Sequence, residues 1–122
     1  MVEHSPWIGE NYGKNGYPVM LWGFSHHQPN DAHDYIEMTR RTIEEEALTD
    51  RHWFFQRIKN IFGEKNSVAF WESVAFANTL PNAVSDSNIY SDGDTSDAAR
   101  AALKSRVSRT LEELKPRKVI VF

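Results

Sequence analysis

The chain of 122 residues contains no cysteine, which excludes disulfide bonds, thiolate nucleophiles and cysteine-based zinc sites. It has no uninterrupted apolar run of about 18 residues, as a membrane-spanning helix requires, and its polar N-terminus is not typical of a signal peptide. The chain also has no excess of positive charge. Its net charge of −3 argues against strong nonspecific attraction to a polyanion. We therefore expect a cytoplasmic protein with no membrane partner.

The composition that remains is that of an ordinary globular protein. Hydrophobic residues make up 40% of the chain and charged residues 25%. The length fits a single domain spanning residues 1–122. Aromatic residues, at 12% with four tryptophans, favour a core or a pocket lined by flat rings.

Three short apolar segments predict buried strands. They are Val19–Trp22, which ends at Gly23, then Val74–Thr79, and finally Lys118–Phe122. Continuous apolar runs of this length are typical of parallel strands that are buried on both faces.

Helices are expected between these strands. Apolar residues recur at helical spacing over Asp34–Leu48, from Thr49–Asp50 to Gly63, and over Ala98–Leu114. In the second helix we expect Trp53, Phe54 and Phe62 to be core residues. In the third, Ala99, Leu103, Val107 and Leu111 define the buried face by steps of four, and Arg100, Lys104, Arg106 and Arg109 are expected to be solvated.

The order strand, helices, strand, helix, strand implies right-handed crossovers. We predict an α/β fold, a three-layer α/β/α sandwich with a short, mainly parallel sheet. No helix follows the third strand to cover it, so three alternatives stay open: a minimal domain, a truncated chain, or a homo-oligomer that covers this strand. The N-terminal residues 1–16 are expected to form a surface arm, with a lip of Asn11, Tyr12 and Lys14 over the site as the alternative.

Polar residues follow the first two predicted strands. Ser25, His26, His27 and Asp31 come after Gly23, and Asn78 lies at the end of the second strand. In open α/β sheets ligands bind outside the carboxyl ends of strands, so this is the predicted site. Histidine suits proton transfer near neutral pH, and the asparagine amide offers one donor and one acceptor. Neighbouring side chains at a strand end point in opposite directions, and we favour His26 over His27 as the one that faces the site.

Three passages together resemble the uracil-DNA glycosylase superfamily. Val19–His27 is similar to the family's first strand and the motif that follows it. Val74–Thr79 is similar to its second strand, which ends in an asparagine, and Leu111–Phe122 is similar to its passage of helix, Leu-Lys-Pro and strand. The resemblance spans residues 7–122.

The resemblance implies a glycosylase-like fold and a function in DNA repair, namely base excision of uracil or a modified base by hydrolysis of the N-glycosidic bond. The implied partner is DNA, and no cofactor or metal is expected. The implied catalytic residues are Ser25, His26 and Asp31, and the implied base-binding residues are Phe24, His27 and Asn78.

Two departures from the family pattern support an alternative. Ser25 stands where the family commonly has the Asp or Asn that activates water, and the family's later strand and histidine-containing loop have no counterpart before Phe122. The alternative is an inactive glycosylase-like module that binds DNA or a protein partner.

Other interpretations of the same residues remain. His26, His27, Asp31, His33 and Asp34 include metal-ligating types, but their spacing matches no specific metal signature. Each histidine also has a structural alternative as a surface or capping residue. For Asn78 that alternative is a buried amide that ties down loops at a strand end.

Overall fold

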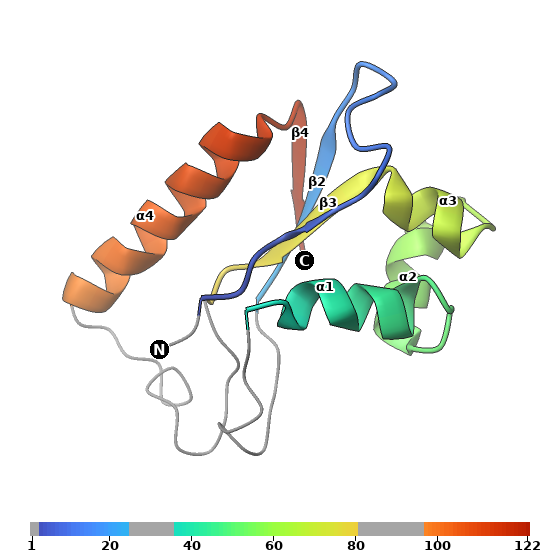
Figure 1. Cartoon of the computed structure of the whole chain (residues 1–122), viewed down its shortest axis with the longest axis horizontal. Helices are drawn as coiled ribbons and strands as arrows, with labels where there is room; N and C mark the ends of the chain where they lie inside the picture. Colours follow the sequence, from blue (N-terminus) through green and yellow to red (C-terminus); the bar gives the residue numbers. More distant parts are fainter. Residues whose placement is uncertain (1–2, 25–35, 81–96) are drawn as a thin grey trace.

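The computed structural model describes residues 3–24, 36–80 and 97–122, which include one four-stranded sheet (Figure 1). The strand order is β1 (Trp7–Ile8), β3 (Val74–Asn78), β2 (Val19–Gly23) and β4 (Lys118–Val121). β2 pairs in parallel with β3 and with β4, and β1 is antiparallel to β3. The expected mainly parallel sheet is thus confirmed. β1 is an addition, because two residues are too few for a strand pattern to be recognised in the sequence.

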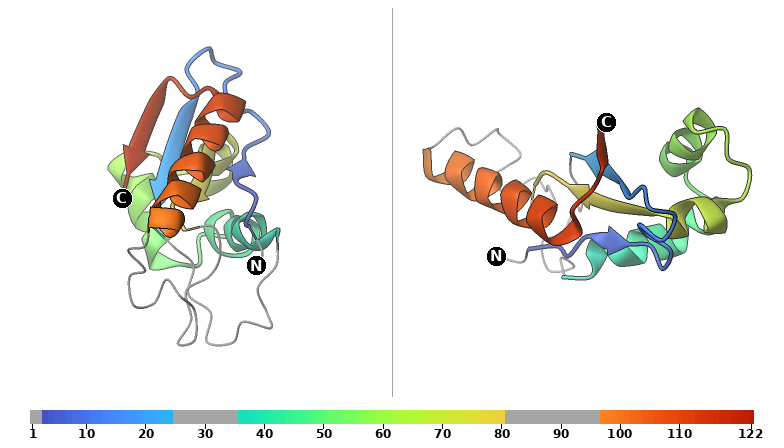
Figure 2. Two further views of the ribbon diagram at one scale, coloured as in Figure 1. Left: turned by 90° about the vertical axis from the view of Figure 1, so that its left-hand side faces the viewer. Right: turned by 90° about the horizontal axis from the view of Figure 1, so that it is seen from above.

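Helices cover both faces of the sheet (Figure 2). On one face α1 (Met38–Thr42) runs into a π-helical turn, η2 (Ile43–Ala47), followed by α2 (Trp53–Ile61) and α3 (Ser67–Glu72). The long helix α4 (Asp97–Leu114) lies on the other face. The expected layering of helix, sheet and helix is therefore present. None of the described helices is long and apolar enough to cross a bilayer.

Alternation along the central strands divides the core into two clusters. Leu21 and Phe76 belong to the cluster formed with η2, α2 and α3, whereas Met20 and Trp22 pack against α4. The partly buried residues that α4 contributes to this cluster are Val107 and Leu111, both on the predicted face, and Leu114.

Trp71 lies at the centre of the larger cluster and is fully buried. The rings of Phe55, Phe70 and Phe76 meet it edge-on, with centroids 5.4, 5.1 and 6.1 Å away. Each such contact adds about 0.5–1.5 kcal/mol beyond the area it buries. The indole Nε1 of Trp7 donates to the carbonyl oxygen of Trp71 at 2.8 Å. This aromatic cluster joins β1, α2, α3 and β3.

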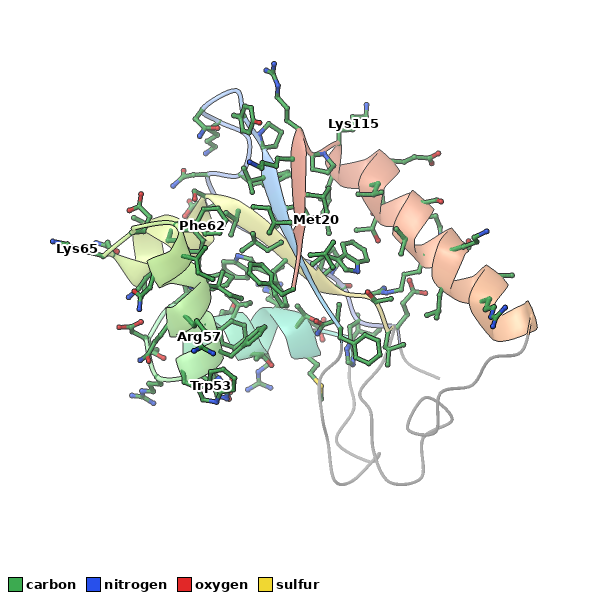
Figure 3. All side chains as sticks on the ribbon, turned by 180° about the vertical axis from the view of Figure 1, so that it is seen from behind. Met20, Trp53, Arg57, Phe62, Lys65 and Lys115 are labelled. Carbon is green, nitrogen blue, oxygen red and sulfur yellow. The ribbon has the colours of Figure 1, made fainter. Side chains whose placement is uncertain are left out.

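The second expected helix differs from the prediction at its start and in its buried face. α2 begins at Trp53 rather than at Thr49–Asp50, because Asp50 has a φ of 57°. Phe55 and Ile58 face the core, so Trp53 is 63% exposed and Phe62 is 37% exposed (Figure 3). The expectation of buried Trp53 and Phe62 was wrong, because the true apolar face lies two residues further along the chain from Trp53.

The predicted stop of α2 and the buried positions of the first predicted helix agree with the structure. Gly63 follows Phe62, the C-cap residue of α2, and has a φ of 73°, which suits a residue without a Cβ. Ile43 and Ala47 are buried, as the periodicity indicated. The residues before Ile36 in that expected helix lie outside the described part of the chain.

After β1, residues 9–12 of the N-terminal arm lie at the amino ends of the strands. Gly9 N–H donates to the carbonyl of Val74 at 2.9 Å, and the Tyr12 hydroxyl donates to the carbonyl of Leu114 at 3.0 Å. Both partners lie far from the carboxyl ends of β2 and β3. The alternative of a lip that includes Tyr12 over the predicted site is therefore wrong, and the expected surface arm instead contributes β1 to the sheet and Trp7 to the core.

Candidate functional site at the carboxyl ends of two strands

β2 and β3 end side by side at one edge of the sheet. Gly23 and Asn78, the last residues of the two strands, are register partners. The pairing extends beyond them, since Thr79 N–H donates to the Gly23 carbonyl at 3.1 Å and Leu80 N–H donates to the Phe24 carbonyl at 3.0 Å. The structure therefore brings Phe24 and Asn78, two of the predicted base-binding residues, to adjacent strand ends.

The Asn78 amide lies against the backbone of Gly23. A Cβ placed on Gly23 would sit 2.4 Å from the Asn78 Oδ1 atom and 3.0 Å from the Phe76 ring. Real Cβ atoms do not come as close as 2.4 Å to another atom, so any side chain at this position would force the Asn78 amide to move. The Asn78 side chain is buried, with 3% exposure. The Gly23–Asn78 pair thus fixes where a polar amide stands at the sheet edge.

A buried arginine holds the backbone of Asn78. From α4, Arg106 donates through Nε and Nη2 to the Asn78 carbonyl at 3.3 and 3.2 Å. Its Nη1 atom donates to the His4 carbonyl at 3.1 Å and to the Glu3 carboxylate at 3.0 Å. One guanidinium therefore ties the end of β3 to the N-terminal arm.

The expectation that Arg106 is solvated was wrong, because its side chain is only 4% exposed. Steps of four drift around a helix of 3.6 residues per turn, whereas alternating steps of three and four stay on one face. That alternation gives the stripe Leu103, Arg106, Val107, Thr110, Leu111 and Leu114. The signal that predicts Arg106 burial is thus present in the sequence.

The indole of Trp22 adds a second polar tie at the same edge. Its Nε1 donates to the Thr79 hydroxyl at 2.6 Å, and that hydroxyl donates to the Gly23 carbonyl at 3.2 Å. A buried indole N–H needs a partner, and Thr79 supplies it just beyond the end of β3. The backbone at Asn78 and at the next residue is therefore held by two polar ties, both from the face of the sheet that α4 covers.

A charged hollow of about 190 Å³ lies between the N-terminal arm and α4. Its lining includes two arginines and two glutamates, Glu3, Arg106, Arg109 and Glu113. Arg109 Nη2 donates to Glu3 at 3.1 Å, so Glu3 bridges both arginines. Because the charges balance, this hollow is a structural ion-pair network rather than an anion site.

The predicted site residues divide into two groups. Phe24, directly after β2, is 64% exposed, and Asn78 is buried beside it. The predicted catalytic residues Ser25, His26 and Asp31, together with His27, lie outside the described residues. His33 and Asp34 of the metal alternative lie there too. Among the residues that are described, no three His, Cys, Asp or Glu side chains gather into a metal site.

No family model, curated protein or solved structure matches this chain. The α/β class of the protein is defined by its own sheet and helices. Its function is argued below from the residues at the carboxyl ends of β2 and β3.

Proposed function

We propose that this protein binds a nucleobase at the carboxyl ends of β2 and β3 and excises uracil or a modified base from DNA. The observation that supports this most is the Asn78 amide, buried at a strand end with its Oδ1 against Gly23. An enzyme that acts on a base in DNA takes it out of the stack and recognises its Watson–Crick edge by hydrogen bonds.

The chemistry of Asn78 suits this task. Its amide offers an NH₂ donor and a carbonyl acceptor, which match the O4 acceptor and the N3–H donor of uracil. Burial removes competing water, and the bonds from Arg106 to the Asn78 carbonyl hold the backbone in place. A buried polar group that a wrong ligand leaves unpaired discriminates strongly against that ligand.

Phe24 supplies a second element of recognition. Its backbone pairs with Leu80, two residues beyond Asn78, and its side chain is 64% exposed. An exposed aromatic ring and a hydrogen-bonding amide are the two elements that hold an extruded base, because stacking contributes about 1–3 kcal/mol per base. In this proposal Ser25, His26 and Asp31 activate the attacking water, and His27 contacts the base.

Excision assays test the proposal directly. Duplex and single-stranded oligonucleotides carrying uracil or modified bases are incubated with the protein, and base release is measured. Asn78→Asp replaces the NH₂ donor by an acceptor at nearly constant volume, so we expect uracil release to fall about 100-fold or more. Asn60→Ala, at an exposed asparagine of α2, is the matched control and should retain full activity.

Single substitutions distinguish the roles of the predicted catalytic residues. Loss of release in His26→Ala or Asp31→Ala, with uracil binding retained, identifies the group that activates water. Base release that survives both Ser25→Ala and Asn78→Ala contradicts the proposed site.

One observation favours a second candidate, an inactive glycosylase-like module that binds DNA or a protein partner. Ser25 occupies the position at which the resemblance implies a carboxylate or amide, and a serine hydroxyl is a poor base for activating water. Fluorescence anisotropy with uracil-containing oligonucleotides distinguishes the two. Binding that requires Asn78, without base release from any substrate, supports the inactive module.

A further inference from the structure

In the described part of the chain, β4 is the last strand at one edge of the sheet. It pairs with β2 alone among the described strands, and it lies at the margin of the molecule (Figure 2). Its side chains are also exposed: Val119 by 40%, Val121 by 70% and the following Phe122 by 40%. α4 covers β2 and β3 on that face but leaves these valines bare. The edge is therefore apolar and unprotected.

Some backbone N–H and C=O groups of β4 point away from β2, toward the open edge of the sheet. Lys118 N–H donates to the Pro18 carbonyl at 3.3 Å, and Phe122 N–H donates to the Trp22 carbonyl at 2.9 Å. Because backbone groups alternate along a strand, the N–H and C=O of Val119 and Val121 point away from β2. Protective devices of natural edges, such as a proline or a mid-strand charge, are absent from Val119–Phe122.

We propose that this edge pairs with the same edge of a second copy of the chain, antiparallel about a two-fold axis at Ile120. In this register Val119 faces Val121 of the second copy, and Ile120 faces Ile120. The outward groups of Val119 and Val121 then form four inter-strand hydrogen bonds, and the two sheets join into one. A two-fold interface requires a self-complementary surface, and this segment is one.

Side-chain chemistry favours the second copy and the antiparallel direction. The exposed valines of the two strands gather on the α4 side of the joined sheet as cross-strand pairs. Lys118, the single charge of the strand, lies opposite Phe122 of the other copy, and the two lysines are about 14 Å apart. A parallel pairing would set the two lysines side by side, where like charges repel.

The small area of the proposed contact between the two β4 strands indicates a weak dimer. A strand pair of about five residues on each side lies below the 1,200 Å² of a standard stable interface, so we expect a dissociation constant of about 10 μM or weaker. Sedimentation velocity from about 5 to 500 μM should show a monomer–dimer equilibrium.

Two substitutions test whether the β4 edge is the surface that forms the dimer. Val121→Lys places a charge on the edge and should abolish the dimer without unfolding the chain, because this side chain is 70% exposed. Val68→Lys, at an exposed valine of α3, is the control and should dimerise normally. A monomer at every concentration, or a dimer that is unaffected by Val121→Lys, overturns the proposal.

The register is tested by cysteine cross-linking, which the absence of native cysteine makes clean. Ile120 faces its own copy in a non-hydrogen-bonded pair with Cα atoms about 4.5 Å apart, within the disulfide range of about 4.4–6.8 Å. Ile120→Cys should form a disulfide-linked dimer under mild oxidation, and Phe122→Cys, about 14 Å from its counterpart, should not. Efficient cross-linking through Phe122→Cys instead would refute this register.

Discussion

At the scale of single residues, Arg106 is the side chain on which the end of β3 depends. It donates to the backbone carbonyls of His4 and Asn78 and to the carboxylate of Glu3. Two buried carbonyls lose a charged donor when it is removed. We expect Arg106→Ala to lower the free energy of unfolding by about 2–4 kcal/mol in urea denaturation.

The neighbouring Arg109 provides the comparison for Arg106. It is 54% exposed and bonds to Glu3 alone among the described residues, so Arg109→Ala should change stability by about 0.5 kcal/mol or less. Equal losses for the two variants would contradict the structural role assigned to Arg106.

Gly23 is the second residue whose role can be tested in isolation. In Gly23→Ala the new Cβ would lie 2.4 Å from Asn78 Oδ1, so the amide must move. We expect a loss of about 1–3 kcal/mol in stability and a loss of uracil binding, measured by anisotropy. Gly16→Ala is the control: it strains a turn residue with a φ of 79° and costs about 1 kcal/mol, but it should leave binding intact.

At the scale of elements, one polar cluster ties the turn after η2 to α2 and α3. Lys59 Nζ donates to Asp50 Oδ1 at 2.9 Å and to the Ser67 hydroxyl at 3.1 Å, and that hydroxyl donates to Asp50 at 3.0 Å. The hydrogen bonds from Lys59 and Ser67 hold the pKa of Asp50 below its ordinary value of 3.8. A depressed pKa means that the folded state favours the ionised carboxylate.

Because the pKa of Asp50 is lowered in the folded state, the protein should lose stability as the pH falls. The stabilisation by Asp50 is complete above its ordinary pKa of 3.8 and is lost as pH falls through the lower pKa of the folded state. Urea denaturation from about pH 6 to about pH 2.5 should therefore show a steeper loss of stability in the wild type than in Asp50→Asn. Asparagine tolerates the left-handed backbone at this position.

An exposed ion pair between α1 and η2 serves as the reference for this titration. Arg40 contacts Glu44 at 3.3 Å, and both side chains are largely in solvent. Glu44→Gln should leave the pH profile close to that of the wild type, because exposed pairs contribute little. If Glu44→Gln flattens the profile as much as Asp50→Asn does, the Asp50 cluster is not the source.

At the scale of the whole molecule, the proposed pairing of β4 predicts that stability depends on protein concentration. A dimer that forms only from folded chains stabilises them by mass action. The thermal midpoint should rise by roughly 3 °C or more over a hundredfold range of concentration, as measured by calorimetry. For Val121→Lys the midpoint should stay constant over the same range.

Much of the fold was predictable from local patterns. Contiguous residues predict the apolar runs of β2, β3 and β4 and the end of α2 near Gly63. The face of α2 was mispredicted, because Trp53, Phe54 and Phe55 are all aromatic and periodicity alone does not choose among them. Phe76 of β3 and Trp71 of α3 decide between them, because the Phe55 ring packs edge-on against both.

The candidate site was predictable in part. Gly23 and Asn78 each end an apolar run, and the parallel pairing of such runs places their ends together. The contribution of Arg106 was missed, because its partners Glu3, His4 and Asn78 lie far away in sequence, and nothing local to α4 indicates them.

By itself, the sequence determined the order of β2, β3 and β4 and of the longer helices between them, the parallel pairing of these three strands and the absence of cysteine chemistry. These depend on residue spacing and composition, which act over a few positions. Only the tertiary structure decided which distant groups Arg106 bonds to, that the Asn78 amide rests on Gly23, that Trp53 faces outward and that the outer edge of β4 has no partner among the described strands. Those outcomes depend on which distant segments meet, because burial and hydrogen bonding are set by contacts across the sheet.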